Sequence, residues 1–397
     1  MQFVQYATYC IPIGFFVAIL KSLGYSEGAT ALILAGTNVF TILALPVYGY
    51  LNDYVITVKK VVLASTAVAF AAIIMIPFCG GNLFAVFLLF ALISMSARAL
   101  PSIMDGYVTK LTLIRSGLTY STTRAFGSLG YALTAIIIGR VIDRFGFTVI
   151  FFIDAALLIV QFIIARGLED VPLARAGGRR GMAAAGSGAG DIGFFEAIKQ
   201  LCRIPRFVIY VVSTTISYLG TNGAQSFLVI LVLYVGGNNG QYGMAIAIMA
   251  FSEVAVLLSY RRALRGFKAR NILMVSLAGF LLKAALFSVS GTVGMVLLTC
   301  LTQAISYAIF TPSSMEYIQE MVPENLMATA ITLSSAVNGS ISNMLGVLAA
   351  GFLINLYGIV FVFRAAAVLC LLGLAIFAAG VILGRKGKKT RPAHARG

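Results

Sequence analysis

Twelve apolar stretches, each long enough to cross a membrane, constrain this sequence more than any other feature. A spanning helix needs about 20 mostly apolar residues, and the stretches are continuous rather than alternating between apolar and polar positions. We therefore expect helices and not a β-barrel. The stretches lie near residues 3–20, 28–51, 61–79, 83–105, 117–139, 147–165, 207–235, 241–260, 272–290, 293–315, 327–354 and 359–383. The sequence predicts an all-α polytopic membrane protein with 12 transmembrane helices.

Composition agrees with this class and excludes several kinds of chemistry. Hydrophobic residues make up 60% of the 397 residues and charged residues 11%, against about a quarter charged in a soluble domain. The five cysteines are scattered, without a CxxC pair, and the only histidine, His394, lies in a basic tail. We therefore expect no metal site, no cofactor and no histidine proton switch.

One long hydrophilic connection divides the helices into six plus six. Its middle is rich in Gly, Ala and Arg, as in a flexible linker, and the following FFEAIKQLCRIP (194–205) predicts an amphipathic helix on the membrane surface. The predicted organisation is an N-terminal six-helix bundle over 1–165, a cytoplasmic linker over 166–206, a C-terminal six-helix bundle over 207–384 and a basic cytoplasmic tail over 385–397.

The basic residues predict the orientation. With the N-terminus inside, 22 of the 29 Lys and Arg fall on cytoplasmic loops and the tail, and only Lys21, Arg140 and Arg144 fall outside. This asymmetry follows the positive-inside rule, so both termini are expected in the cytoplasm. The expected location of the protein is the plasma or inner membrane of the cell. The basic cytoplasmic loops, which set the topology and attract anionic membrane lipids, explain the net charge of +16. We therefore exclude nucleic acid as a partner. No cleavable signal peptide is evident, so the sequence given is expected to start in its first spanning helix, with a basic leader before that helix as the open alternative.

The two halves repeat. PSIMD (101–105) returns as PSSME (312–316) at an offset of 211 residues, and GRVIDRFG (139–146) returns as GFLINLYG (351–358) at an offset of 212. Parallel six-helix repeats place a substrate site at their interface, near the middle of the bilayer.

Charged residues inside the apolar stretches are the first candidates for that site, because each costs roughly 2.5–3.5 kcal/mol on insertion scales. Arg124 is about eight residues inside the fifth helix, and Asp105 lies at a similar depth on the fourth. Arg98 precedes Asp105 by two helical turns and shares its face. Glu253, eleven residues into the eighth helix, is the first candidate proton carrier, and Asp105 is the second.

Uncharged polar residues on the inner helices could complete the site. The best cluster is SYLGTNGAQ (217–225), whose glycines could let the seventh helix unwind around a ligand. The substrate-binding candidates are Asp105, Arg124, Glu253, Arg98, Asn222, Gln225 and Gln303. The alternative role for each is a structural contact between helices, above all an ion pair of Asp105 with Arg124. Asp154 and Lys283 are expected to be structural partners rather than ligands.

Twelve helices, a central linker and duplicated halves resemble the major facilitator superfamily. Gly49-Tyr50-Leu51-Asn52-Asp53 followed by Lys59-Lys60 resembles the superfamily's loop signature between helices 2 and 3. The resemblance implies a gating loop formed by Gly49, Asp53, Lys59 and Lys60. Ile56 stands where a second Gly is usual, and RRALRGFKAR (261–270) keeps only the basic part of the signature in the second half.

Within that superfamily, PSIMDGYVTKL…STTRAFGSLGYAL (101–133) is similar to the lactose-permease-like oligosaccharide/proton symporters and their sugar, nucleoside and aromatic-acid relatives. The resemblance implies that Asp105 and Arg124 form a substrate-binding charge pair and that Glu253 is an acidic ligand. The group's His and Glu on helix 10 are replaced here by Gln303 and Ser306. Another carboxylate would therefore have to carry a proton.

These observations predict a secondary active transporter, not an enzyme. We expect a monomeric permease that moves a small polar organic solute (a sugar or glycoside, a nucleoside or an organic acid) by alternating access, with protons as the coupling ion in symport. A drug or lipophilic-compound exporter of the same superfamily is the alternative within transport. A membrane enzyme would need a catalytic motif such as HExxH or GxSxG, which is absent. A transporter-derived membrane sensor is the remaining alternative.

Overall fold

The computed structural model describes residues 1–50, 57–79, 82–114, 120–169, 194–263 and 266–389. Every regular element in these ranges is helical, as lipid requires, because only a helix satisfies its own backbone hydrogen bonds within one segment. Within these ranges ten helices are long and apolar enough to span a membrane, and two bent helix pairs raise the number to 12 if each pair is one span. This confirms the predicted all-α, polytopic fold.

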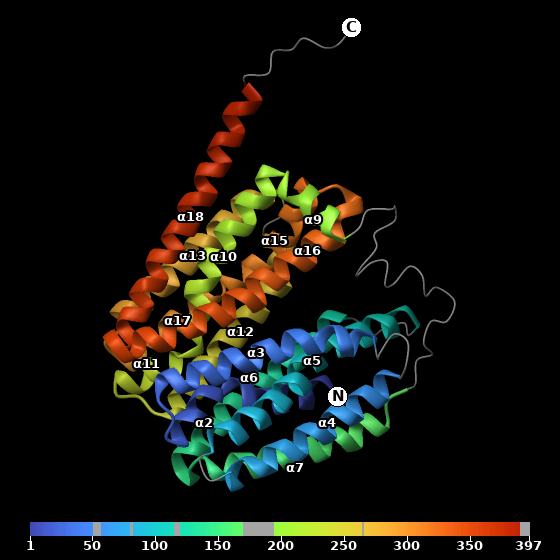
Figure 1. The fold of residues 1–397 in the computed structure, drawn as a ribbon, viewed down its shortest axis with the longest axis vertical. Coiled ribbons are helices and arrows are strands. Elements are labelled where there is room, and N and C mark those ends of the chain that lie inside the picture. The colour runs from blue at the N-terminus through green and yellow to red at the C-terminus, as the bar shows by residue number, and fades with distance from the viewer. Residues whose placement is uncertain (51–56, 80–81, 115–119, 170–193, 264–265, 390–397) are drawn as a thin grey trace.

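The N-terminal half is the blue-to-green bundle in Figure 1. Its elements are α1 (Gln2–Tyr9), a π-helical stretch (Cys10–Gly14), α2 (Phe16–Ser22), α3 (Glu27–Tyr50), α4 (Val58–Met75), a 3₁₀ turn (Ile76–Phe78), α5 (Leu83–Ile114), α6 (Tyr120–Phe145) and α7 (Thr148–Arg166).

The C-terminal half is the bundle coloured from yellow-green to red in Figure 1, and its helices are broken at more places. Its elements are α9 (Phe194–Cys202), α10 (Pro205–Ser226), α11 (Leu228–Tyr234), α12 (Asn239–Ala263), α13 (Ala269–Val289), α14 (Val293–Cys300), a 3₁₀ turn (Leu301–Gln303), α15 (Tyr307–Met321), a 3₁₀ turn (Glu324–Leu326), α16 (Met327–Ser335), a π-helical stretch (Ala336–Ile341), α17 (Ser342–Tyr357) and α18 (Ile359–Lys389).

Helix α7 illustrates how the bundle is built for lipid. The polar side chains Asp154 and Gln161 are both 1% exposed and point into the protein, whereas Phe152 and Ile163 are more than half exposed. A soluble helix turns its polar side outward; here the apolar side faces outward, where lipid tails would solvate it. The few polar groups of the span are therefore available inside the N-terminal half.

The repeat seen in the sequence is also present in the backbone. The first span bends by 47° at Phe15 and the seventh by 52° at Phe227. Both residues have φ −102°, with ψ of 15° and 18°. Gly24 and Gly236 leave the bent spans with φ of +87° and +84°, a left-handed conformation that favours glycine. Each pair is separated by 212 residues, the offset already found between the GRVIDRFG and GFLINLYG segments.

The halves meet at one end of the molecule, which we call the closed end: there α6 finishes, α12 begins and α2 contacts α11 (Figure 1). The α6–α12 contact is close because Gly243 lies against the carbonyl of Ala135; a Cβ on Gly243 would collide with that oxygen. The opposite end, where α7 finishes and α9 begins, is called the linker end.

Hydrogen bonds between the halves, among the described residues, lie in the middle and toward the closed end. They join Asp143 to Asn239 and Gly240, Tyr242 to Gly14, Asn38 to Asn343 and, with its amide oriented to satisfy both partners, Asn355 to Glu27 and Gly28. Among the described residues, the hydrogen bonds between α3 and α17 thus extend from Glu27 to Asn38.

The segment after the linker forms helix α9, which contacts α10 and α16 and buries Leu201 completely. The Gly/Ala/Arg-rich segment before it, residues 170–193, lies outside the described residues, as do residues 390–397 of the basic tail. Helix α18 continues to Lys389, six residues beyond the predicted span.

Candidate functional site

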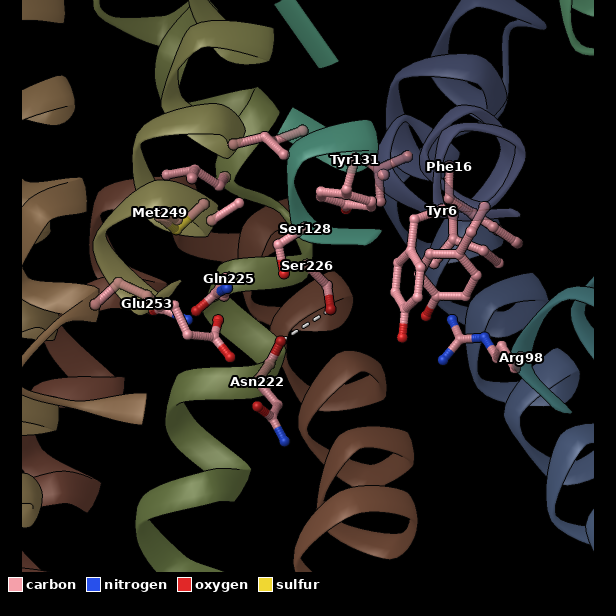
Figure 2. Close-up of a pocket in the computed structure, with 18 of the residues that line it drawn as sticks. Tyr6, Phe16, Arg98, Ser128, Tyr131, Asn222, Gln225, Ser226, Met249 and Glu253 are labelled. Atoms are coloured by element: carbon pink, nitrogen blue, oxygen red, sulfur yellow. Dashed lines mark hydrogen bonds between the residues drawn. The ribbon is translucent and has the colours of Figure 1, made fainter. Parts of the chain in front are cut away.

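A cavity of about 390 Å³ lies between the two halves, within the size range of small-molecule sites. Figure 2 shows its N-terminal wall, with Tyr6 and Arg98, facing a C-terminal wall that carries Glu253, Gln225 and Asn222. Its lining residues are Tyr6, Tyr9, Ile13, Gly14, Phe16, Val17, Leu34, Arg98, Arg124, Ser128, Tyr131, Asn222, Gln225, Ser226, Leu228, Tyr242, Ile246, Met249, Ala250, Glu253, Gln303 and Asn343. Six of the seven predicted substrate-binding residues are among them.

The N-terminal wall combines two arginines with a row of tyrosines. The Arg124 guanidinium carbon lies 4.5 Å from the centroid of the Tyr6 ring, a cation–π arrangement. Tyr6 contacts Tyr9, and Tyr9 contacts Tyr131, with ring centroids 6.1 Å apart in each pair. The aromatic row therefore fixes the arginine side of the cavity.

Both arginines have unused hydrogen-bonding capacity. Nη1 of Arg124 and Nε of Arg98 are buried and have no hydrogen-bond partner in the part of the chain that the structure describes. A buried guanidinium N–H without an acceptor is costly, and its fork is suited to carboxylate, phosphate or hydroxyl oxygens. These two atoms are candidates to donate to a solute.

The C-terminal wall is organised by a lysine that sequence reasoning did not select for the site. Lys283 on α13 is 3% exposed and lies behind the wall. Its Nζ donates to Oε1 of Gln225 at 2.5 Å and to Oε1 of Gln303 at 2.6 Å. The ammonium thus fixes both amide oxygens away from the cavity and leaves the amide nitrogens to donate elsewhere.

Glu253 is the carboxylate of the same wall. The Gln303 amide and the charges of Arg124 and Lys283 all act on it. Arg124 belongs to the N-terminal half and Glu253 to the C-terminal half, so this attraction crosses the cavity between the halves. The lining therefore carries two guanidinium groups and one carboxylate, a net positive charge.

Asp105 does not line the cavity, and it makes no ion pair with Arg124. Its Oδ1 accepts a hydrogen bond from Nε2 of Gln2 at 3.5 Å, while Arg124 lies over Tyr6. Seven residues separate Arg98 from Asp105, which is about 10 Å along α5. That rise carries Asp105 past the cavity toward the linker end although both residues share a helix face.

The predicted gating loop is only partly covered by the structure. Gly49 belongs to the last turn of α3, and Lys59 and Lys60 begin α4. Asp53 lies outside the described residues. Lys60 is exposed at the linker end, away from the cavity.

Two further tyrosines of the lining were not selected from the sequence, although a helical pattern could have found them. Arg124, Ser128 and Tyr131 follow one another at i, i+4 and i+7, which places them on one face of α6. Tyr242 stands eleven residues before Glu253 on α12, three turns away on the same face. Its hydroxyl donates to the Gly14 carbonyl at 2.8 Å and closes the cavity at that level.

Comparison with known proteins places these features in a family. The model of the MFS_1 like family matches residues 1–365. The maltose permease of Geobacillus stearothermophilus is 23% identical over 331 residues, covering 83% of this chain and 80% of the permease. The uncharacterized transporter YwbF of Bacillus subtilis (strain 168) is 21% identical over 361 residues, covering 90% and 86%.

Solved structures share the fold. A mutant form of the nucleoside transporter NupG superposes with a TM-score of 0.82 at 15% identity, covering 96% of this chain and 98% of NupG. A mutant form of the peptide transporter POT gives a TM-score of 0.68 at 16% identity, covering 96% and 92%. The chain belongs to the MFS_1 like family of the major facilitator superfamily and is a multi-pass membrane protein for the secondary transport of small solutes.

Proposed function

We propose that this transporter moves a small polar organic solute (a sugar or glycoside, a nucleoside or an organic acid) by alternating access, with protons as the coupling ion. The observation that carries the proposal is the cavity between the halves, with unpaired Arg98 and Arg124 nitrogens on one wall and Glu253 on the other. Charges at this depth are expensive in a membrane. An apolar cargo would leave them unmatched, so a cargo with oxygen acceptors fits better.

The aromatic residues of the cavity support a ring-bearing solute. Tyr6, Tyr9, Tyr131 and Tyr242 line the same cavity as the arginines and offer flat, partly polar faces. Such faces can pack against a sugar or base while the arginines bind its oxygens. The relative named maltose permease and the structural neighbour NupG, named a nucleoside transporter, support this class of cargo.

Proton coupling is assigned to the Glu253 carboxylate. When ionised, it attracts Arg124 across the cavity. When a proton binds the carboxylate, that attraction between the halves is lost and the Arg124 guanidinium is released toward an anionic or hydroxyl group of the solute. Proton binding and solute binding would then favour each other.

The orientation and organisation follow the sequence predictions. We place both termini in the cytoplasm and the closed end outside, with bundles at 1–165 and 207–384 rocking as a monomer in the cell membrane around the cavity. Lys59 and Lys60 at the linker end, and the basic residues of the linker and tail, would then face the cytoplasmic leaflet and its anionic lipids.

A thermal-shift panel on the purified protein in detergent tests the cargo class. It covers sugars, nucleosides, organic acids and lipophilic cations, and a ligand at 100 times its Kd should stabilise the protein by about 2.7 kcal/mol. We expect a polar compound to stabilise the wild type and Arg364→Ala, whose side chain is exposed on α18, but not Arg124→Ala. Stabilisation by lipophilic cations alone would favour an exporter and refute the polar cargo.

Uptake of that compound into proteoliposomes then tests the coupling. An inward proton gradient should accelerate uptake by the wild type and by Glu320→Gln, an exposed carboxylate at the linker end, but not by Glu253→Gln. The variant should still exchange solute across the membrane, because only the coupled step is lost. A gradient response that survives Glu253→Gln contradicts this assignment, and binding without movement of solute would favour a sensor.

A further inference from the structure

A second, much smaller cavity of about 20 Å³ lies wholly inside the N-terminal half. Roughly 10–15 Å³ is enough for one water-sized particle, so this cavity has room for a single small occupant. It is lined by Gln5, Thr8, Tyr9, Pro12, Thr66, Ala69, Ile73, Ile93, Ala97, Leu100, Asp154, Leu158 and Gln161, from the first span, α4, α5 and α7.

Two polar side chains of this wall have no partner among the described residues. Asp154 is 1% exposed, and among the described residues it makes neither an ion pair nor a hydrogen bond; its Oδ1 is fully enclosed. Gln5 is 2% exposed, and neither its amide oxygen nor its amide nitrogen is hydrogen-bonded. Buried polar groups are nearly always paired, so both side chains indicate an occupant that the protein itself does not supply.

The other polar side chains of this wall, Thr8, Thr66 and Gln161, are hydrogen-bonded to one another. Oγ1 of Thr8 donates to Oε1 of Gln161 at 2.7 Å, and Nε2 of Gln161 donates to Oγ1 of Thr66 at 2.9 Å. These bonds tie α1, α7 and α4 together and leave lone pairs on hydroxyl and amide oxygens. The site offers carboxylate, amide and hydroxyl oxygens, the hard donors that suit alkali and alkaline-earth cations rather than transition metals.

Charged groups of the neighbouring elements do not balance the carboxylate. Tyr9 and Cys10 face it from the first span, whereas α4 contributes only hydroxyl and apolar groups to the wall. Arg98 on α5 and Tyr131 on α6 line the larger cavity between the halves instead. An ionised carboxylate buried without a counter-charge is strongly unfavourable, so a cation must accompany it.

We propose that Asp154, with Gln5, forms a buried monovalent-cation site in the N-terminal half, separate from the solute cavity. The occupant neutralises the carboxylate, either as Na⁺ bound by the surrounding oxygens or as a proton on Asp154. The two compete for one group: when Na⁺ enters the protonated site, the carboxylate–sodium pair forms and one proton leaves to solvent. A divalent ion is disfavoured, because one carboxylate leaves half of its charge unmatched.

Tyr9 lines both cavities and lies between them. Its ring also packs on the ring of Tyr6, and the Arg124 guanidinium lies over that Tyr6 ring. A cation beside Asp154 would therefore change the support of the arginine wall. This coupling rests on the proposed function, whereas cation binding does not and is tested first without any solute.

The test measures the thermal stability of purified protein in choline chloride, with NaCl, LiCl or KCl replacing choline at constant ionic strength. We expect a saturable rise in Tm with Na⁺ for the wild type and for Glu320→Gln, and none for Asp154→Asn, which keeps the shape of the side chain. Gln5→Leu should weaken the apparent Na⁺ affinity at least tenfold. In weak buffer, Na⁺ should release up to one proton per wild-type molecule and none from Asp154→Asn.

Infrared spectroscopy identifies a proton as the occupant. If Na⁺ has no effect, the wild type should show the C=O stretch of a protonated carboxyl group that is insensitive to Glu253→Gln and absent from Asp154→Asn. An Asp154 that is ionised in choline buffer and indifferent to Na⁺ and Li⁺ would overturn the proposal. Should Asp154→Asn fail to fold, direct binding of radioactive Na⁺ to the wild type and to Gln5→Leu, together with their infrared spectra, decides between the same outcomes.

Discussion

The Asp143 carboxylate at the end of α6 accepts a hydrogen bond from the backbone N–H of Gly240 at 2.7 Å, at the first turn of α12. Its other oxygen accepts from the Asn239 backbone N–H at 3.0 Å. A side chain of one half thus caps a helix of the other half, and its charge complements the positive end of that helix. The closed end is held by this cap as well as by packing.

Asp143→Ala should loosen the closed end. Loss of a capping side chain costs about 0.5–2 kcal/mol, which corresponds to a shift of roughly two- to thirtyfold toward conformations that are open there. Spin labels at the exposed positions Thr148 and Tyr234, one on each half, would report a longer distance by pulsed electron resonance. Arg144→Gln changes a neighbouring charge whose guanidinium lies over the Phe145 ring, and it should leave the distance unchanged. An equal change in both variants would contradict the capping role.

Lys283→Met should reduce solute affinity without a matching loss of stability. The substitution frees the oxygens of Gln225 and Gln303, and their amides can then rotate within the cavity wall. Leaving these acceptors unpaired destabilises the fold, but removing a buried ammonium offsets part of that loss. We expect at least a tenfold rise in Kd for the compound found in the thermal-shift panel. Lys60→Met, at an exposed lysine, serves as the control, and unchanged affinity in Lys283→Met would show that the lysine does not position the site.

Tyr6→Phe and Tyr6→Leu separate the ring from the hydroxyl. The Arg124 guanidinium lies on the face of this ring, and a cation–π contact contributes about 0.5–2 kcal/mol. Phenylalanine keeps the ring, so the affinity of Tyr6→Phe for solute should equal that of the wild type, whereas Tyr6→Leu should lose roughly two- to thirtyfold. Titration calorimetry with the same compound measures both, and an equal loss in the two variants would point to the hydroxyl instead.

Phe15→Ala and Phe227→Ala should destabilise the protein by similar amounts. Both side chains are completely buried at the equivalent bends of the first and seventh spans, and truncating a buried phenylalanine costs roughly 3 kcal/mol or more. Thermal unfolding in detergent compares them with Phe352→Ala, whose side chain is 65% exposed. A large effect in only one of the pair would show that the two bends are not equivalent in packing.

Hydropathy was enough to predict the helical fold, because lipid leaves the backbone no alternative to helix over an apolar stretch of this length. It did not reveal the bends at Phe15 and Phe227, since an average over about 20 residues is the same for a straight and a bent span. The glycines that follow them, Gly24 and Gly236, carried a signal that was not used: they share the 212-residue offset of the later repeat.

The site was less predictable from the sequence. The helical period indicated that Arg98 and Asp105 share a face, but not how far the cavity extends along α5, and the cavity ends before Asp105. Lys283 was expected to be a structural partner, and it is one; its partners Gln225 and Gln303 are nevertheless cavity residues. Which helix a buried charged side chain faces depends on packing between segments far apart in the sequence. A local sequence pattern therefore does not predict that neighbour.

The equal spacing of the backbone landmarks has a consequence for how this chain can be cut and extended. Phe15 precedes Gly146 by the same number of residues as Phe227 precedes Gly358, so each half carries a complete set of its bends and left-handed glycines. The connection over residues 170–193 lies between these sets. A polypeptide severed there would retain all of its landmarks on one fragment or the other, and the two fragments, made separately, should reassemble into a working carrier. A residue inserted within one set would instead change the spacing of the bends and glycines in that half, so that it no longer equals the spacing in the other half.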